Sequence, residues 1–205
     1  MTKRLNAKKK LSRKLGGSLW GQAKDPYLKR NYKPGQHGAA TKGRSSDYGV
    51  QLRAKQRLKF SYGNISEKQF FNTFVLASKS KGDVSENFVA LLESRLDTVV
   101  YRANFVATVF AARQFVSHKH VTVNGKTVNI ASYRLKVGDV VQVKEKSRKL
   151  AIVIDSVQKM ERDVPSYLLL DKDNFSVKLS EKPSFAEVPY AVEMEPHLIT
   201  EFYSR

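Results

Sequence analysis

Apolar residues recur at helical spacing in the first half of this 205-residue chain. The segment 47–61 follows Ser46, whose hydroxyl can accept one of the free N–H groups that begin a helix. A second helix should follow Ser66, because Ser66 and Gln69 have the spacing of a capping box. Its buried face is an apolar stripe made of Phe70, Phe71, Phe74 and Ala77. A third helix is predicted to open near Ser85.

The next segment combines helical spacing with regularly placed cations. Leu92, Leu96, Val99 and Ala103 fall on one helical stripe, which places Arg95 and Arg102, seven residues apart, together on another face. Thr108 can cap a second helix. We expect that helix to bury its apolar positions and to leave Arg113 projecting from its surface.

Two-residue periodicity takes over in the second half. Valines alternate around Asn124-Gly125, the pair that favours a type I′ hairpin turn, so residues 121–128 are predicted to form a hairpin. Residues 137–146 supply a further strand, and "YLLLD" and "FSVKL" are short strand candidates. Residues 150–157 fit a helix, although their β-branched residues leave a strand open. The final "PHLITEFYSR" fits one or two helical turns. These elements predict an α+β protein whose sheet is small and antiparallel.

The charge of the chain indicates what kind of partner it binds. The chain carries a formal net charge of +18, with 17 Lys or Arg against two acids in residues 1–60 and six against ten in residues 151–205. So large a charge requires a compensating polyanion, and nucleic acid is the first candidate. An anionic membrane surface and an acidic protein are weaker candidates. We expect residues 1–45 to be a basic arm, largely disordered until it meets RNA.

The loop at the end of this arm suits a phosphate backbone. Residues 31–49 are rich in glycine, and Gly35 and Gly38 could let backbone N–H groups approach phosphates closely. Lys33, Lys42 and Arg44 lie beside them. Arg53 and Arg57, four residues apart on the predicted helix, project from one face.

Several functional classes are disfavoured. The chain has no cysteine, so it has neither disulfides nor a thiolate metal site, and its four scattered histidines do not replace one. We predict no metal and no cofactor. No apolar run reaches the roughly 20 residues of a membrane span, and the N-terminus lacks the apolar core of a secretory signal. An organellar presequence, which is also basic, stays open. No P-loop, Rossmann glycine pattern or nucleophile with a plausible base is found.

A series of motifs closely resembles one family over nearly the whole chain. The motifs are "PGQHG" at 34–38, "SDYGVQLRAKQ" at 46–56, "YGNISEKQF" at 62–70, "LLESRLDTVVYR" at 91–102, "ARQFVSHKHVTVNGKTVNIASY" at 112–133 and "HLITEFYS" at 197–204. Together they are similar to the bacterial or organellar small-subunit ribosomal protein S-four family, which carries an S-four RNA-binding domain.

The resemblance implies an architecture and a set of contacts. It implies a basic rRNA-binding arm and loop at 1–45, a mainly helical body at 46–91 completed by the tail at 192–205, and an inserted S-four domain with a strand-bearing extension at 92–191. Together, the loop reading and the resemblance give a candidate RNA-binding set: Lys33, Gly35, Gln36, His37, Lys42, Arg44, Arg53, Arg57, Arg95, Arg102, Thr108, Arg113, His118, Lys119, Asn124 and Lys126. Val109 stands where relatives often have Arg.

The resemblance also implies a function without catalysis. Such a protein is a structural constituent of the small ribosomal subunit. It binds a junction in the 5′ domain of small-subunit rRNA, nucleates assembly, and lies near protein five, the mRNA entry side and the region that affects accuracy. Its location is the bacterial cytoplasm, or an organelle matrix.

Two other functions use an S-four domain. One is an RNA-modifying enzyme, since "SRLD" resembles the motif that carries the catalytic Asp of pseudouridine synthases. We expect Asp97 to form an ion pair instead, and too few residues follow the hairpin for a synthase domain. The other is a free-standing RNA chaperone, which needs neither the "PGQHG" loop nor the tail motif.

Overall fold

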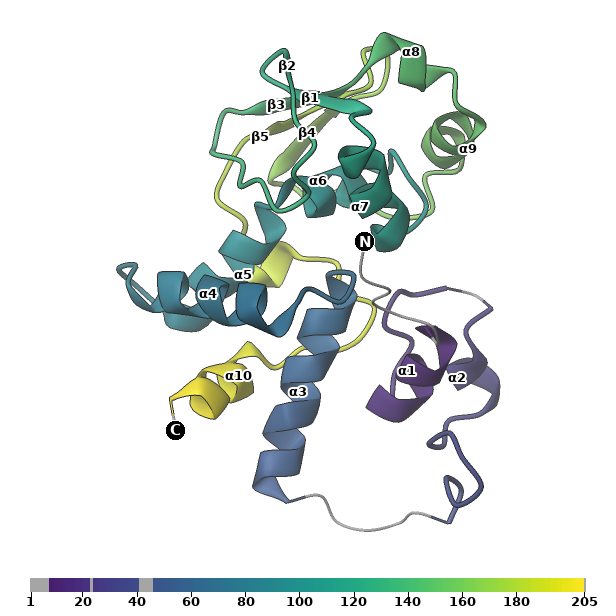
Figure 1. The fold of residues 1–205 in the computed structure, drawn as a ribbon, viewed down its shortest axis with the longest axis vertical. Coiled ribbons are helices and arrows are strands. Elements are labelled where there is room, and N and C mark those ends of the chain that lie inside the picture. The colour runs from purple at the N-terminus through teal and green to yellow at the C-terminus, as the bar shows by residue number, and fades with distance from the viewer. Residues whose placement is uncertain (1–7, 23, 41–45, 205) are drawn as a thin grey trace. The chain divides into compact units, whose positions relative to one another are not determined.

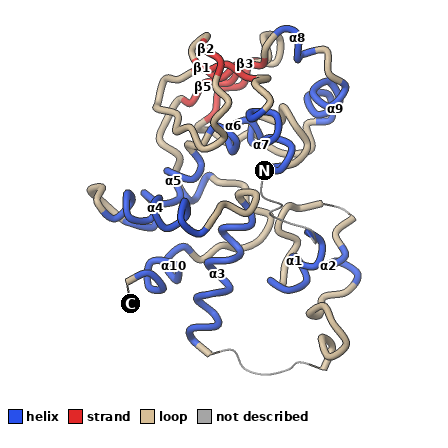
Figure 2. Tube along the Cα trace, in the orientation of Figure 1, coloured by secondary structure: helices blue, strands red, loops and turns tan. Residues whose placement is uncertain are grey.

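The computed structural model describes residues 8–22, 24–40 and 46–204 (Figure 1). The chain divides into two compact units, one made of residues 1–74 and 190–205 and the other of residues 75–189. The second unit therefore begins within helix α4 (Glu67–Ser78), earlier than the start at residue 92 expected for the RNA-binding domain. Figure 2 shows that all the strands found among the described residues lie in the second unit.

The first unit is built on a long helix and the C-terminal tail. Helix α3 (Asp47–Ser61) begins where predicted, with the Ser46 hydroxyl accepting a hydrogen bond from the Gly49 N–H. Helix α10 (Pro196–Tyr203) packs on α3, and Gln51 donates to Glu201 at 2.9 Å. Leu58, Ile65, Phe70 and Ile199 are buried there. The predicted helices over 47–61 and the tail are thus confirmed.

The described part of the basic arm is folded. Helix α1 (Lys8–Leu15) and helix α2 (Pro26–Lys29) are joined by a hydrogen bond of 2.8 Å from the buried Ser12 hydroxyl to the Asp25 carboxylate. Asp25 also caps α2, and Leu15 and Leu19 are buried. The expectation of a largely disordered arm is therefore wrong for these residues. Composition alone overlooked a core made of a few leucines and one buried polar pair.

The second unit contains one antiparallel sheet of five strands. In order across the sheet these are β2 (Lys126–Thr127), β1 (Val121–Val123), β3 (Val140–Val143), β5 (Ser176–Leu179) and β4 (Leu168–Asp171). The pairing of Val121 with Val143 and of Val141 with Val177 places alternate side chains on one face, where they are buried. The α+β class and the hairpin at 121–128 are confirmed.

Five helices lie wholly within the second unit. They are α5 (Val84–Glu93), α6 (Leu96–Arg102), α7 (Val109–Ser117), α8 (Glu145–Arg148) and α9 (Ala151–Lys159), with a short 3₁₀ turn η1 (Phe185–Glu187). Helix α6 packs on α7, and Figure 1 shows both below the strands of their unit. Residues 151–159 are helical, so the segment for which both a helix and a strand were left open is a helix.

The helical stripe predicted across residues 92–103 is interrupted. Helix α5 ends at Glu93, and Arg95 has an extended backbone with φ −72° and ψ 140° before α6 begins. The Leu96 N–H donates to the Tyr133 carbonyl at 2.8 Å, and the Asp97 N–H to the Ala131 carbonyl at 3.1 Å. The prediction of one continuous stripe is wrong, because these bonds to a distant segment replace helical ones.

Candidate nucleic-acid interface

Arg95 lies in the interior of the second unit. Its side chain is 5% exposed and donates to both oxygens of Asp97, at 3.0 Å from Nε to Oδ1 and 2.7 Å from Nη2 to Oδ2. Asp97 Oδ1 also accepts the Thr98 N–H. The predicted projection of Arg95 towards RNA is corrected accordingly, because a carboxylate two residues along the chain holds its guanidinium inside. Asp97 is held in an ion pair and is only 3% exposed.

Arg102 is buried in the same way but with more distant partners. It forms a bidentate pair with Glu93, and its Nη1 donates to the Pro189 carbonyl at 3.0 Å. The Tyr167 hydroxyl donates to Glu93 Oε2 at 2.8 Å, so the carboxylate has three donors although it is fully buried. The expected surface position of Arg102 is therefore also corrected. Both arginines support the fold on which the remaining cations are carried.

Helix α7 presents the first of those cations. The Thr108 hydroxyl accepts the Ala111 N–H at 3.1 Å and so caps α7, as the sequence indicated. Arg113 is half-buried on α7, and the adjacent turn of the helix buries Ala112 and Val116. Val109, where relatives often have Arg, is 3% exposed and belongs to the core. It therefore offers no side chain to a partner.

Imidazole and ammonium groups lie close together at the C-terminal end of α7. His118 and Lys119 are exposed, and Lys119 has a φ of 65°, the left-handed conformation that lets the chain leave the helix for β1. His120 stacks on Phe115 with ring centroids 4.8 Å apart, and its Nδ1 lies 2.9 Å from the Ser147 hydroxyl. Burial and the nearby His118 and Lys144 lower the pKa of His120. An anion placed here would meet several donors.

The hairpin turn follows directly. Asn124 and Gly125 have φ values of 48° and 78°, as a type I′ turn requires. The Asn124 side chain donates to Asp139 at 2.8 Å and accepts the Val140 N–H at 2.9 Å. Asn124 therefore ties the turn to β3, while Lys126 stands exposed on β2.

Arg13, which the sequence analysis did not select, fixes the loop that contains Tyr32 and Lys33 in the first unit. Arg13 donates to the carbonyls of Tyr32 and Lys33 at 3.1 and 3.2 Å, and its guanidinium lies 4.7 Å from the centre of the Tyr32 ring. Gly38 packs so closely that an added Cβ would lie 1.8 Å from the Lys33 carbonyl oxygen. Gly38 is therefore required for loop closure.

The outer side of that loop carries the candidate RNA contacts. Lys33, Gly35, Gln36 and His37 are exposed, and Gly35 has a φ of 107°. Lys42 and Arg44 lie outside the described residues. Arg53 and Arg57 are half-buried on α3, and Arg57 Nε donates to the Leu15 carbonyl at 2.8 Å. Arg57 thus joins α3 to the end of α1, a structural role that its spacing alone did not reveal.

Arg134 is a further exposed cation that the sequence reading did not select. Its backbone forms an isolated antiparallel bridge with Arg95. Burial and the charge of Arg95 lower the pKa of Arg134. Only the tertiary pairing of residues 95 and 134 brings the two together, so no local motif indicated it.

Two other kinds of site are not found among the described residues. Among the described residues, no group of three or more His, Cys, Asp or Glu side chains is arranged to hold a metal ion. No helix in that part of the chain is long and apolar enough to cross a bilayer. Each unit carries its own set of exposed cations, and these are the candidate contacts for nucleic acid.

Comparison with known proteins identifies the family of the chain. The family model described as "Ribosomal protein S4/S9 N-terminal domain" matches residues 3–93, and the model described as "S4 domain" matches residues 94–141. The small ribosomal subunit protein uS4 of Brucella abortus (strain S19) is 59% identical over 205 residues, which cover 100% of both chains. The chain belongs to the uS4 family, that of the S-four protein. The uS4 of Brucella ovis is also 59% identical, and that of Brucella anthropi 58%, each over the same full length.

Membership of the uS4 family decides the question of catalysis. The chain is a structural, RNA-binding protein and not an enzyme. The buried ion pair of Asp97 is consistent with this, because a carboxylate held by two guanidinium nitrogens has no access to a substrate. The boundary between the two family models, at residues 93 and 94, coincides with the interruption between α5 and α6.

Proposed function

We propose that this chain is a primary rRNA-binding protein of the small ribosomal subunit. In this role it binds a junction in the 5′ domain of the rRNA, nucleates assembly, and later lies beside protein five at the mRNA entry side, in the region that affects accuracy. The observation that carries the proposal is the 59% sequence identity to uS4 proteins over the full length of the chain. The chain is then located in the small ribosomal subunit, either in the cytoplasm or in an organelle.

The arrangement of cations supports RNA as the main partner. Lys119, Lys126 and Arg134 are exposed on the second unit, and Lys33 is exposed on the first. Side chains of this kind neutralise phosphates, while Gln36, His37 and the turn at Asn124 can donate hydrogen bonds to RNA. The buried pairs Arg95–Asp97 and Arg102–Glu93 stabilise the helices from which this surface is built.

Binding to defined transcripts tests the proposal. The purified chain should bind a transcript of the 5′ domain with one-to-one stoichiometry, and a transcript in which the junction is replaced by a continuous helix should bind much more weakly. In ordered assembly, omission of this chain should prevent later proteins from joining. Equal affinity for the two transcripts would contradict the proposed junction.

The two rival functions make different predictions. An RNA chaperone would bind many unrelated RNAs and would leave the small subunit in high salt, whereas the proposed protein co-sediments stoichiometrically. A modifying enzyme would produce pseudouridine in rRNA fragments. The first outcome would favour the chaperone, and turnover in the second assay would overturn the structural role.

A further inference from the structure

His120, which the sequence analysis did not select, lies between α7 and β1 and beside the start of α8. Val121 pairs with Val143 at the end of the sheet, so His120 and Lys144 are neighbours just beyond it. The Lys144 N–H donates to the His120 carbonyl at 3.0 Å. The His120 ring stacks on the buried Phe115, with centroids 4.8 Å apart. Backbone pairing and stacking together fix the position of this imidazole.

A hydrogen bond to Ser147 decides which ring nitrogen of His120 carries the proton. Ser147 is 6% exposed, and its hydroxyl oxygen lies 2.9 Å from His120 Nδ1. A buried hydroxyl hydrogen needs an acceptor, and Nδ1 is the acceptor found for it among the described residues. The Ser147 hydroxyl therefore donates to Nδ1, and the neutral imidazole carries its proton on Nε2.

The Nε2–H of His120 is a donor directed away from the protein. No hydrogen bond to Nε2 is found among the described residues, and this nitrogen is not one of their enclosed polar atoms that lack a partner. Nε2 is therefore open to solvent while Ser147 and Phe115 hold the rest of the ring. A donor that is fixed before binding loses little entropy when it meets an acceptor.

Positive groups act on this imidazole from two elements. His118, at the end of α7, has its ring centroid 6.1 Å from that of His120, and Lys144 precedes α8. Burial of the ring, together with the charges of His118 and Lys144, lowers the pKa of His120 below its ordinary value. The ring is therefore mainly neutral at pH 7, and its Nε2–H is a neutral donor among cations.

The neighbouring residues favour an anionic acceptor. Lys119 precedes His120 in the chain, and Lys146 is exposed on α8. Glu145 is the one acid in residues 118–120 and 143–149. A group that accepts a hydrogen bond and carries negative charge fits these surroundings better than a neutral acceptor does.

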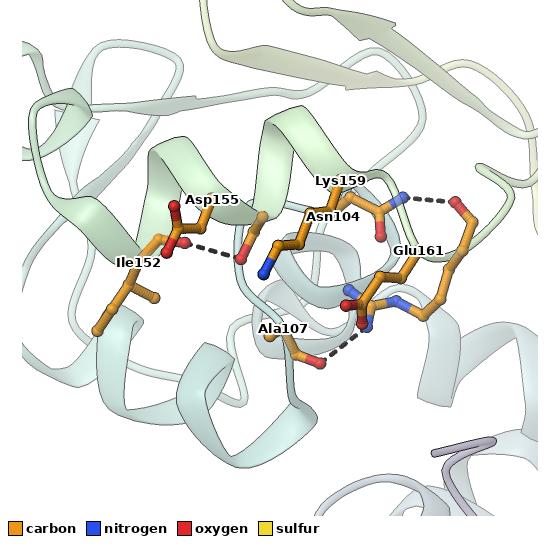
Figure 3. Close-up of a pocket in the computed structure, with 8 residues that line it drawn as sticks. Asn104, Ala107, Ile152, Asp155, Lys159 and Glu161 are labelled. Carbon is orange, nitrogen blue, oxygen red and sulfur yellow. Dashed lines mark hydrogen bonds between the residues drawn. The ribbon is translucent and has the colours of Figure 1, made fainter. Parts of the chain in front are cut away.

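A cavity lined by residues of α9 and of the segment after α6 differs in its charge (Figure 3). Asp155 and Glu161 line it together with Lys159 and Arg162, so its lining has no net charge. A phosphate placed there would meet two carboxylates. The end of α7 is therefore the better site for an anion.

We propose that the Nε2–H of His120 donates to a phosphate oxygen of the RNA backbone, with Ser147 as a positioning residue. Lys119 and Lys144 supply positive charge beside the same phosphate. This inference rests on the proposed function, because small-subunit rRNA supplies the phosphate. It extends the candidate RNA contacts from the end of α7 to the start of α8.

The tautomer of His120 tests the role of Ser147. Long-range proton–nitrogen correlation spectra of the full chain, labelled with nitrogen-15 at histidine, report which nitrogen of each ring is protonated. At pH 8 we expect the Nε2–H tautomer for His120 in the wild type and a mixture of both tautomers in Ser147→Ala. An Nδ1–H tautomer in the wild type would overturn the proposal. This measurement needs only the folded wild type, so it holds even where a variant is less stable.

Affinity for a transcript of the 5′ domain tests the contact itself. His120→Phe keeps a ring that can stack on Phe115 but lacks the donor, so affinity should fall about fivefold. His120→Gln provides an amide N–H near the position of Nε2 and should lose less than about twofold. The matched control is His197→Phe, the same exchange at an exposed histidine of the first unit, and it should bind as the wild type does. Melting temperatures establish that each form is folded.

Salt dependence separates the hydrogen bond from charge. A neutral donor releases no counterion, so His120→Phe should leave the slope of log affinity against log salt unchanged, whereas Lys144→Ala should reduce its magnitude by about 1. Wild-type affinity in His120→Phe, equal losses in His120→Phe and His120→Gln, or a smaller slope in His120→Phe would overturn this contact and leave the proposed function intact. Failure of the wild-type chain to bind the transcript would overturn the proposed function itself.

Discussion

Arg102 on α6 holds Glu93, the last residue of α5, through two hydrogen bonds of 3.1 and 2.8 Å. A planar guanidinium is required for this geometry, and lysine cannot reproduce it. The pair joins two helices across the interruption at Ser94-Arg95. We therefore expect the pair to contribute to the stability of the second unit rather than to the affinity of its surface.

Removal of one partner from this buried pair should be strongly destabilising. Arg102→Ala leaves the Glu93 carboxylate buried with the Tyr167 hydroxyl as its remaining side-chain donor among the contacts described. The expected loss is about 3–5 kcal/mol of unfolding free energy, measured by urea denaturation. Lys126→Ala, on an exposed position, is the control and should change stability by less than about 0.5 kcal/mol. Equal stability of the two variants would show that Arg102 is not part of the core.

Arg113 should show the opposite behaviour to Arg102. We predict that Arg113→Lys leaves the melting temperature nearly unchanged, because charge and most of the side-chain volume are kept. Its affinity for the rRNA should fall by about 1 kcal/mol, because lysine cannot hold two phosphate oxygens at once. A filter-binding titration and a thermal melt of the same preparation measure both effects. An early melt would place Arg113 among the structural arginines.

The hairpin turn depends on the backbone conformation of one glycine. Nothing lies within 4 Å of a Cβ added at Gly125, so any effect of substitution there comes from its φ of 78°. Gly125→Val should cost about 1–2 kcal/mol, whereas Gly125→Asn should cost less because Asn adopts the left-handed conformation more readily. Denaturation of the two variants compares them directly, and the reverse order would contradict the turn assignment.

Gly38 is sensitive for a steric reason instead. Gly38→Ala places a methyl group against the Lys33 carbonyl, which Arg13 also holds, so the loop must open. RNA affinity should fall while the melting temperature changes little, because the loop is largely exposed. Ala39→Ser, at the adjacent exposed position, is the control. An unchanged affinity of Gly38→Ala would remove this loop from the RNA surface.

The contact between Glu67 on α4 and the tail helix α10 should make the stability of the protein depend on pH. Burial by itself raises the pKa of Glu67, but hydrogen bonds from Lys55, Tyr203 and Lys59 outweigh it and lower the pKa from 4.5 to about 2. A lowered pKa in the folded state adds stability above pH 4.5, and that stability is lost as the pH falls from 4.5 towards 2. The Glu67 side chain is 48% exposed, so its contribution at pH 7 is only about 1 kcal/mol.

Glu67→Gln tests this dependence. The variant should melt earlier than the wild type at pH 7, and the difference should disappear as the pH falls through this range. Glu193→Gln, which alters an exposed carboxylate of the same unit, is the control and should follow the wild type at every pH. A difference between Glu67→Gln and wild type that persists at pH 2 would assign the effect to packing instead of charge.

Local patterns were sufficient for most of the secondary structure. Ser46 marked the start of α3, Asn124-Gly125 marked the hairpin, and the apolar spacing of the tail marked α10, because caps, turns and amphipathic faces depend on residues close in sequence. The net charge and its gradient along the chain pointed to a polyanion without reference to a fold. The family motifs likewise indicated, without reference to a fold, the family to which the chain belongs.

The roles of individual cations were decided only by the tertiary structure. Arg95, Arg102 and Arg113 are alike in a sequence pattern, since helical spacing does not distinguish a face that meets solvent from one that meets a buried carboxylate. Arg102 is buried because the chain brings Glu93, Tyr167 and Pro189 around it, and the last two are more than 60 residues away. The break before α6 has the same origin, because residues 131 and 133 supply its hydrogen-bond acceptors.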